Sequence, residues 1–256
     1  GARTEDLSFV TNATTGVNLV ARSLPLQAGD EVLTTNHEYG ACDVTWERVC
    51  AAQGAHYRRV DLPLPFDAQT FTQRLVEAIT PRTRMIFLSH ITSTTALIFP
   101  IAQACAQARA RGISTLVDGA HAPAHIPLNL DALGADFYTG NCHKWMCAPK
   151  GSAFLHARPE HHAVLHATVT SWGYAAETSG HTGMEAYTGT TLLERRLQWQ
   201  GTRDLSAWLS VPAALDFWQQ HLGPARATAS HDRAIALMHR WCQHVGLHAI
   251  GTDEDF

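Results

Sequence analysis

The chain has 256 residues, of which 45% are hydrophobic and 16% charged, a composition typical of a folded globular protein that excludes an intrinsically disordered one. Its formal net charge of −4 gives no electrostatic reason to expect nucleic acid or an anionic membrane as a partner. No apolar run is long enough to span a bilayer.

Short β-rich runs alternate with Ala-rich helical patterns along most of the chain. Several of the runs lack a period of two, which is typical of strands covered on both faces of a sheet. This alternation predicts an α/β three-layer sandwich with a mainly parallel sheet. The predicted strands are residues 7–10, 31–34, 56–60, 84–88, 115–117, 136–139 and 153–156, and the predicted helices between them are 16–22, 43–52, 68–78 and 101–110.

The character of the sequence changes after residues 201–204. Residues 207–221 and 227–245 have helical patterns and few strand signals. We therefore predict an α/β domain over residues 1–207. Residues 208–256 are predicted to form a helical connection toward a C-terminal small domain that is largely absent. Both ends are expected to lie inside a longer protein.

Cysteine and histidine spacing gives no sign of a metal centre. The six cysteines form neither a CxxC pair nor a dense disulfide framework, so we expect reduced thiols and a cytoplasmic protein. The 16 histidines are scattered and show no HExxH or comparable ligand spacing. No bound metal is therefore predicted.

Lysine occurs only twice, as Lys144 and Lys150, and both copies fall within residues 141–151; the other 17 basic residues are arginine. A guanidinium stays charged in proteins, so arginine cannot replace an amine that must lose its proton and attack a carbonyl. The placement predicts a Schiff-base lysine, although compositional drift would also leave few lysines. Lys150 stands between Pro149 and Gly151, which is typical of a surface turn. Lys144 is therefore the candidate.

Other polar residues stand where predicted strands end, which is where ligands gather in an α/β sheet. Thr14 and Thr15 lie between a strand and a helix, where they could cradle an anion or simply cap the helix. Asp118 ends a buried strand, and could be a metal ligand, a salt-bridge partner or a cofactor anchor. The next strand leads to Lys144, so the acid and the amine should share one edge of neighbouring strands.

An amine, a carboxylate and an anion cradle together match the needs of pyridoxal 5'-phosphate (PLP). The amine bonds the cofactor aldehyde, the carboxylate pairs with the pyridine nitrogen, and the cradle holds the phosphate. Lys144, Asp118 and Thr14–Thr15 would fill these roles. The lysine needs a lowered pKa, which partial burial beside a cation such as protonated His143 would produce.

At this point the sequence resembles a known family, the class V aminotransferase group of fold-type I PLP enzymes, and within it the isopenicillin N epimerase-like branch. Cysteine desulfurases and selenocysteine lyases are related members. The resemblance covers residues 7 to about 215 and implies that residues 1–207 form the PLP-binding large domain. It is carried by segments in the family's order, at residues 12–18, 37–41, 89–96, 117–122, 140–145 and 199–204.

The resemblance also implies a role for individual residues at the cofactor ring. Lys144 should form the Schiff base and move the α-proton, and Asp118 should pair with the pyridine nitrogen. His121 should lie near the ring hydroxyl or the reacting carbon. Tyr39 should cover the ring face, unless it is simply a core tyrosine. Ser93 stands where desulfurases carry Asn, and His121 where they carry Gln, so both favour the epimerase-like branch.

Further roles concern the phosphate and the substrate. Thr14, Thr15, Asn141 and His143 should contact the phosphate, and Thr202 should reach the phosphate of a neighbouring subunit, which implies a homodimer. The substrate is expected to be a small amino-acid-like molecule, turned over by epimerisation, by C–S lyase or desulfurase-like chemistry, or by transamination. A chain that binds the cofactor without turnover is the alternative outside enzymes. The arginine that would bind the substrate carboxylate is expected outside this chain.

Overall fold

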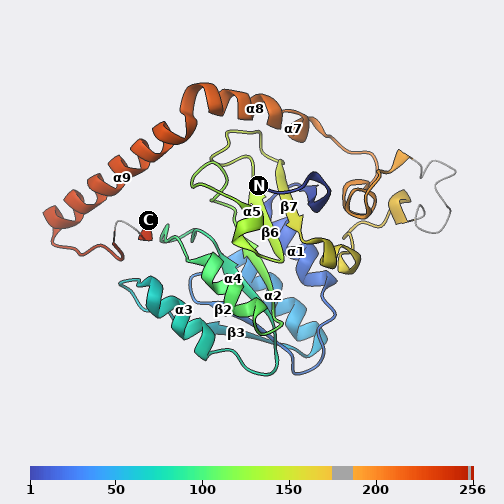
Figure 1. Cartoon of the computed structure of the whole chain (residues 1–256), viewed down its shortest axis with the longest axis horizontal. Helices are drawn as coiled ribbons and strands as arrows, with labels where there is room; N and C mark the ends of the chain where they lie inside the picture. Colours follow the sequence, from blue (N-terminus) through green and yellow to red (C-terminus); the bar gives the residue numbers. More distant parts are fainter. Residues whose placement is uncertain (175–186, 253–254) are drawn as a thin grey trace.

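The computed structural model describes residues 1–174, 187–252 and 255–256, and its centre is one seven-stranded sheet (Figure 1). The strand order is β1-β7-β6-β5-β4-β2-β3. Only β7 runs against its neighbours β1 and β6, while the other pairs are parallel. The strands are β1 (Leu7–Val10), β2 (Glu31–Thr35), β3 (His56–Val60), β4 (Thr83–Ser89), β5 (Ser114–Asp118), β6 (Phe137–Asn141) and β7 (Ala153–Ala157).

Helices cover both faces of the sheet. The helices α1 (Ala13–Ser23) and α2 (Gly40–Gln53) pack on one face, against side chains such as those of Val32 and Leu116. Successive residues of the same strands, Leu33 and Val117, point to the other face. There they meet the helices α3 (Ala68–Glu77), α4 (Ile101–Arg109) and α5 (Leu130–Leu133). The predicted three-layer α/β sandwich with a mainly parallel sheet is confirmed.

The first helix begins earlier than the sequence pattern predicted. α1 starts at Ala13 and not at residue 16, because the side chain of Asn12 caps it by accepting a hydrogen bond from the Thr15 N–H at 2.8 Å. Gly16 lies inside the helix, where a Cβ would come within 2.3 Å of Thr139 Oγ1 on β6. Glycine at this position lets α1 approach the sheet closely.

The last part of the chain is helical, as predicted. The short helices α7 (Ser206–Leu209) and α8 (Val211–Phe217) are followed by a π-helical turn, η5 (Trp218–Leu222), and by α9 (Gly223–Val245). Figure 1 shows α8 and α9 running along the outside of the sandwich. The division of the chain at residue 207 stays a prediction. Among the described residues, no helix combines the length and the apolar character needed to cross a bilayer.

The remaining short elements lie at the margins of the sheet: η1 (Thr4–Asp6), η2 (Pro159–Val164) and the π-helical turn η4 (Glu194–Gln198). The end of the chain returns to the sandwich, where Ile98 N donates to Asp255 O at 2.7 Å. Phe256 is buried there as part of the hydrophobic cluster that also contains side chains of α3 and α4.

Candidate active site

A cavity of about 210 Å³ lies where β4, β5 and β6 end and α1 begins. Because parallel strands end at the same edge of a sheet, this is the place where a ligand site is expected. Eight of the residues predicted from the sequence line the cavity: Thr14, Tyr39, Ser93, Asp118, His121, Asn141, His143 and Lys144. The other lining residues are Asn12, Ala13, Ser89, Ile91 and Ala120.

Lys144 is carried by the loop between the antiparallel strands β6 and β7. Backbone hydrogen bonds close this loop, from Cys142 N to Ser152 O at 3.1 Å and from Ala148 N to Cys142 O at 3.0 Å. Lys144 therefore lies shortly after β6, which ends at Asn141, and is half-buried beside the cavity. Lys150, the other lysine, is exposed in a turn as predicted.

The amine of Lys144 lies beside a neutral imidazole. Its Nζ is 2.7 Å from His121 Nε2. Burial, and then the charge of Lys144, lowers the pKa of His121 to about 4, so the ring is neutral at pH 7. Burial also lowers the pKa of Lys144, against the opposing charge of Asp118. His143, proposed from the sequence as the neighbouring cation, instead hydrogen-bonds Ser152 O at 3.2 Å through Nδ1.

Asp118 is a buried carboxylate whose Oδ2 can accept one more hydrogen bond. Its side chain is 4% exposed, and Oδ1 accepts a hydrogen bond from Ala120 N at 2.9 Å. Among the described residues, Oδ2 accepts only from the weakly donating thiol of Cys42 at 3.5 Å. Burial raises the pKa of Asp118, while the charge of Lys144 lowers it. A protonated ring nitrogen would supply the strong donor that this oxygen lacks.

The start of α1 offers an anion site at the same cavity. Thr14 lines the cavity in the first turn of this helix, where the positive end of the helix dipole favours a negative group. Asn141, at the end of β6, accepts a hydrogen bond from Ala13 N at 2.9 Å through Oδ1. That bond holds the helix start next to the strand that leads to Lys144. A carboxylate, an amine and an anion cradle thus surround one space, which fits PLP.

Two predicted cofactor residues lie outside the cavity lining. The Thr15 hydroxyl hydrogen-bonds Asn12 Oδ1 at 3.0 Å and Thr11 Oγ1 at 2.9 Å, and lines a neighbouring surface hollow. Thr202 is exposed in the segment that precedes α7. The roles proposed for Thr15 and Thr202 stay predictions.

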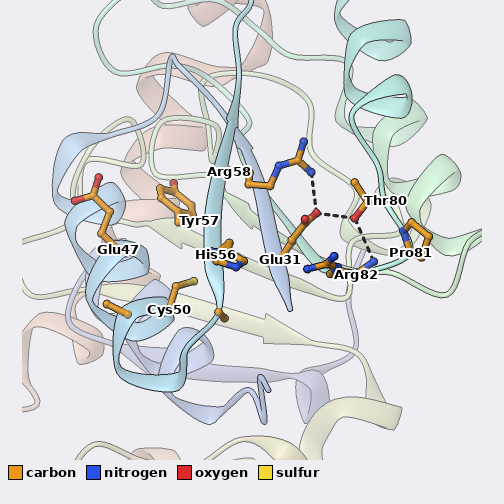
Figure 2. A pocket seen from close by; sticks show the side chains of 11 residues that line it. Glu31, Glu47, Cys50, His56, Tyr57, Arg58, Thr80, Pro81 and Arg82 are labelled. Carbon is orange, nitrogen blue, oxygen red and sulfur yellow. Dashed lines mark hydrogen bonds and ion pairs between the residues drawn. The ribbon is translucent and has the colours of Figure 1, made fainter. Parts of the chain in front are cut away.

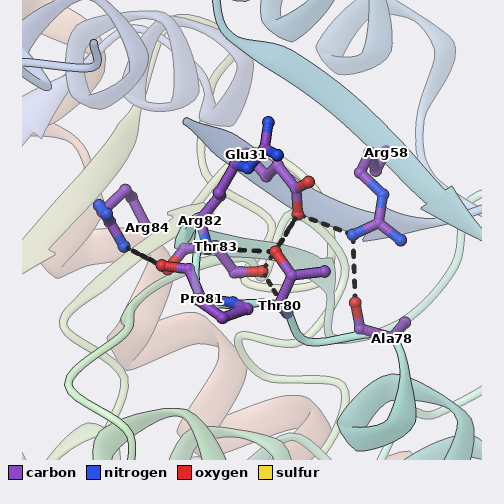
Figure 3. A network of polar contacts seen from close by, with 8 residues as sticks. All are labelled: Glu31, Arg58, Ala78, Thr80, Pro81, Arg82, Thr83 and Arg84. Atoms are coloured by element: carbon purple, nitrogen blue, oxygen red, sulfur yellow. Dashed lines mark hydrogen bonds and ion pairs between the residues drawn. The ribbon is translucent and has the colours of Figure 1, made fainter. Parts of the chain in front are cut away.

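A wider and more open groove, of about 850 Å³, lies at the opposite edge of the sheet (Figure 2). Its polar side chains bind one another: Glu31 Oε2 accepts from Arg58 Nη1 at 2.7 Å and from Thr80 Oγ1 at 2.6 Å. Figure 3 shows this network joining β2 and β3 to the turn that precedes β4. These polar groups already have hydrogen-bond partners within the groove. We therefore assign them a structural role, which is to hold the ends of the strands together.

The described residues contain one group of potential metal ligands, formed by Asp136, Glu160 and His161, with ligand atoms within 4.8 Å of one another. Each carboxylate already has a protein partner. Asp136 accepts hydrogen bonds from Thr115 N at 2.7 Å and from His161 Nε2 at 3.2 Å. Glu160 pairs with Arg158 at 2.8 Å. These contacts account for the cluster without an ion.

The fold and the cavity define an α/β protein of the fold-type I class, with a lysine amine and a buried carboxylate lining one cavity. The sequence profile of the family "Aminotransferase class-V" matches residues 1–254, and the chain belongs to this family. The predicted family of PLP-dependent enzymes is thereby confirmed. Isopenicillin N epimerase from Streptomyces clavuligerus is 46% identical to it over 87% of the chain, and that from Amycolatopsis lactamdurans 43% identical over 88%.

The chain spans 56% and 58% of the length of these two relatives. Its fold is similar to that of a cysteine desulfurase from Thermococcus onnurineus NA1, with a TM-score of 0.78 at 19% sequence identity. That alignment covers 96% of this chain and 60% of the other. A cysteine desulfurase from Escherichia coli gives a TM-score of 0.76 at 22% identity, over 94% of this chain and 58% of the other.

Proposed function

We propose that this protein is a PLP-dependent enzyme that inverts the configuration of an amino acid or amino-acid-like substrate at its α-carbon. The observation that carries the proposal is the single cavity that joins the Lys144 amine, the Asp118 carboxylate and the start of α1. The two isopenicillin N epimerases favour epimerisation among the reactions of the family, because they are 46% and 43% identical to this chain.

In this proposal PLP is held at three points. Lys144 would bond the aldehyde carbon of PLP, Asp118 would pair with the ring nitrogen, and Thr14, Asn141 and His143 would surround the phosphate. Tyr39, His121 and Ser93 would flank the ring, and Thr15 would support the phosphate end. The bound cofactor supplies an electron sink for the pair left behind when the α-proton departs.

The protein's own groups move the proton. With a substrate in the cavity, the Lys144 amine would be available to take its α-proton at Nζ, because burial favours the neutral form of the amine. His121, which is neutral and 2.7 Å away, fixes the position of that amine. The charge on Asp118 would keep the ring nitrogen protonated. Inversion would then need a second proton, delivered from water to the opposite face of the α-carbon, while the proton held at Nζ is released to water.

A second candidate is C–S bond cleavage. The protein named "Putative L-cysteine desulfhydrase 1" from Oryza sativa is 30% identical over 91% of this chain. It supports this alternative less strongly than the epimerases support epimerisation, because its identity to the chain is lower. Cysteine desulfurase-like chemistry and transamination are other reactions of the same family. A protein that binds the cofactor without turnover is the alternative outside catalysis.

We also propose a homodimer in which Thr202 of each subunit reaches the phosphate of its neighbour. The exposure of Thr202 is consistent with this role. A cytoplasmic location is supported by the cysteines at 42, 50, 105, 142, 147 and 242, all of which are free thiols.

The reaction is tested by incubating the PLP-loaded protein with isopenicillin N in deuterated water. We expect deuterium to enter at the α-carbon with loss of chirality and without a keto acid, and we expect Lys144→Ala to abolish the exchange. Release of pyruvate or sulfide from L-cysteine, without α-exchange of isopenicillin N, would replace epimerisation by C–S cleavage. Tight cofactor binding with no change in any substrate would identify a binding protein instead.

A further inference from the structure

Glu38 is a second buried carboxyl beside the active-site cavity, although it does not line the cavity. The residue is 7% exposed. Its Oε1 accepts a hydrogen bond from Thr35 Oγ1 at 2.7 Å, and its Oε2 accepts one from Ser89 N at 2.6 Å. Short bonds to a buried carboxyl group are among the stronger hydrogen bonds in a protein. None of the steps described above uses this carboxyl.

The two partners of Glu38 are the final residues of two neighbouring strands. Thr35 is the last residue of β2 and Ser89 is the last residue of β4. The two strands pair with each other only as far as Leu33 and Ile86. Glu38 therefore joins the strands beyond the end of their ladder. Ser89 is also the register partner of Asp118 on β5. The carboxyl of Glu38 thus fixes the sheet edge that carries the cofactor anchor.

Glu38 also adjoins Tyr39, whose side chain lines the cavity and is 45% exposed. The Tyr39 carbonyl accepts hydrogen bonds from Cys42 N at 2.8 Å and from Asp43 N at 3.1 Å, which begin α2. Cys42 in turn donates its thiol to Asp118 at 3.5 Å. Tyr39 is therefore fixed by its neighbours on both sides along the chain. Glu38 before it is bound to the ends of β2 and β4, and Cys42 after it is bound to the Asp118 carboxylate.

We propose that Glu38 is a positioning residue of the cofactor site, which fixes Tyr39 and the Ser89–Asp118 edge so that the ring is held between Tyr39 and Asp118. This inference rests on the proposed function, because it takes PLP to be the ligand of the cavity. Glu38 itself does not touch the ring. It acts through the main chain of Ser89 and through the segment that carries Tyr39.

The test compares Glu38→Ala and Glu38→Gln with a matched control, Asp136→Asn. Asp136 is also a buried acid, 9% exposed, and it accepts hydrogen bonds from the N–H and the hydroxyl of Thr115 at 2.7 and 2.9 Å. It stands at the opposite edge of the sheet, immediately before β6. Asp136→Asn is therefore the counterpart of Glu38→Gln, because each replaces a buried, hydrogen-bonded carboxyl by an amide, but only Glu38 lies next to the cavity.

Two properties are measured on the full chain, the dissociation constant of PLP and the visible circular dichroism of the bound cofactor, which reports a fixed asymmetric environment. Glu38→Ala should weaken PLP binding roughly ten- to hundredfold, as loss of strong buried hydrogen bonds allows, and should diminish the dichroism per bound cofactor. Glu38→Gln should recover part of both, because the amide oxygen can still accept one bond. Asp136→Asn should match the wild type.

Wild-type affinity and wild-type dichroism in a folded Glu38→Ala protein would overturn the proposal. If that variant does not fold, Glu38→Gln decides: an unchanged dissociation constant and dichroism would overturn it, and a weaker, less dichroic complex would support it. Failure of the proposed function appears separately, as absence of PLP binding in the wild type. In that case amide hydrogen exchange of the cofactor-free proteins tests the positioning, because exchange at Tyr39 and Ser89 should be faster in the variant, and equal rates would refute it.

Discussion

Replacing Glu38 by Gln should remove a pH dependence from the folding stability of the cofactor-free protein. Burial raises the pKa of Glu38 from 4.5 to about 7. Between these two pH values, the folded protein keeps a proton that the unfolded chain has lost. The carboxyl therefore stabilises the fold fully below pH 4.5, and this contribution is lost as the pH rises through about 7.

The size of the effect follows from the shift. At about 1.4 kcal/mol per pKa unit, the change from 4.5 to about 7 corresponds to roughly 3 kcal/mol in the free energy of unfolding. Two histidines act in the opposite sense: burial lowers the pKa of the buried His90 and of the half-buried His121 to about 4, so their contribution is lost as the medium becomes acidic. The difference between the wild type and the variant isolates Glu38 from these groups.

The assay is urea unfolding of the cofactor-free wild type and of Glu38→Gln at a series of pH values from about 4.5 to 8. The stability of the wild type relative to the variant should fall by roughly 3 kcal/mol across this range and then level off. Asp136→Asn is the control. Hydrogen bonds from His161 and Thr115 hold the pKa of Asp136 below its ordinary value of 3.8, so this carboxyl does not titrate over the same range and its difference curve should lack the fall of roughly 3 kcal/mol. A flat curve for Glu38→Gln would refute the reasoning.

Three further substitutions test the packing and the hydrogen bonds around the site. Gly16→Ala would place a Cβ within 2.3 Å of Thr139 Oγ1, so urea unfolding should show a loss of about 1–3 kcal/mol, and unchanged stability would contradict the close packing of α1 on β6. Asn141→Ala should lower stability by about 1–3 kcal/mol and weaken PLP binding, because Ala13 N loses its acceptor. His121→Ala should raise the pKa of Lys144 by admitting water, which pH-dependent amine labelling would detect as a midpoint at higher pH.

The strands and the chemical centre of the site could be predicted from the sequence, since both follow from local patterns. Apolar runs gave the strands, and the rule that ligands gather at strand ends selected Asp118 and Lys144. The sequence predicted both Thr14 and Thr15 as phosphate contacts, and which of them lines the cavity depends on where α1 begins. The Asn12 cap starts the helix at Ala13, so Thr14 lines the cavity while the Thr15 hydroxyl is used in the cap.

The residues behind the site could not be predicted in this way. Glu38 and Cys42 lie in and after the connection that follows β2, and their partners Ser89 and Asp118 are far away in the sequence. Glu38 falls within residues 37–41, one of the segments that carry the family resemblance, but the contacts of both residues follow no period, because they exist only once the sheet has brought the ends of β2, β4 and β5 together. For the same reason the sequence placed His143 beside the lysine amine, where the folded chain has His121.

The central claim is that Lys144 bonds the cofactor. The most direct measurement is to load the purified protein with PLP, reduce it with borohydride and locate the pyridoxyl group by peptide mass spectrometry. We expect the group on Lys144, none on the exposed Lys150, and loss of both the visible band and the labelled peptide in Lys144→Ala. A label on Lys150 instead, or a visible band that persists unchanged in Lys144→Ala, would contradict the account.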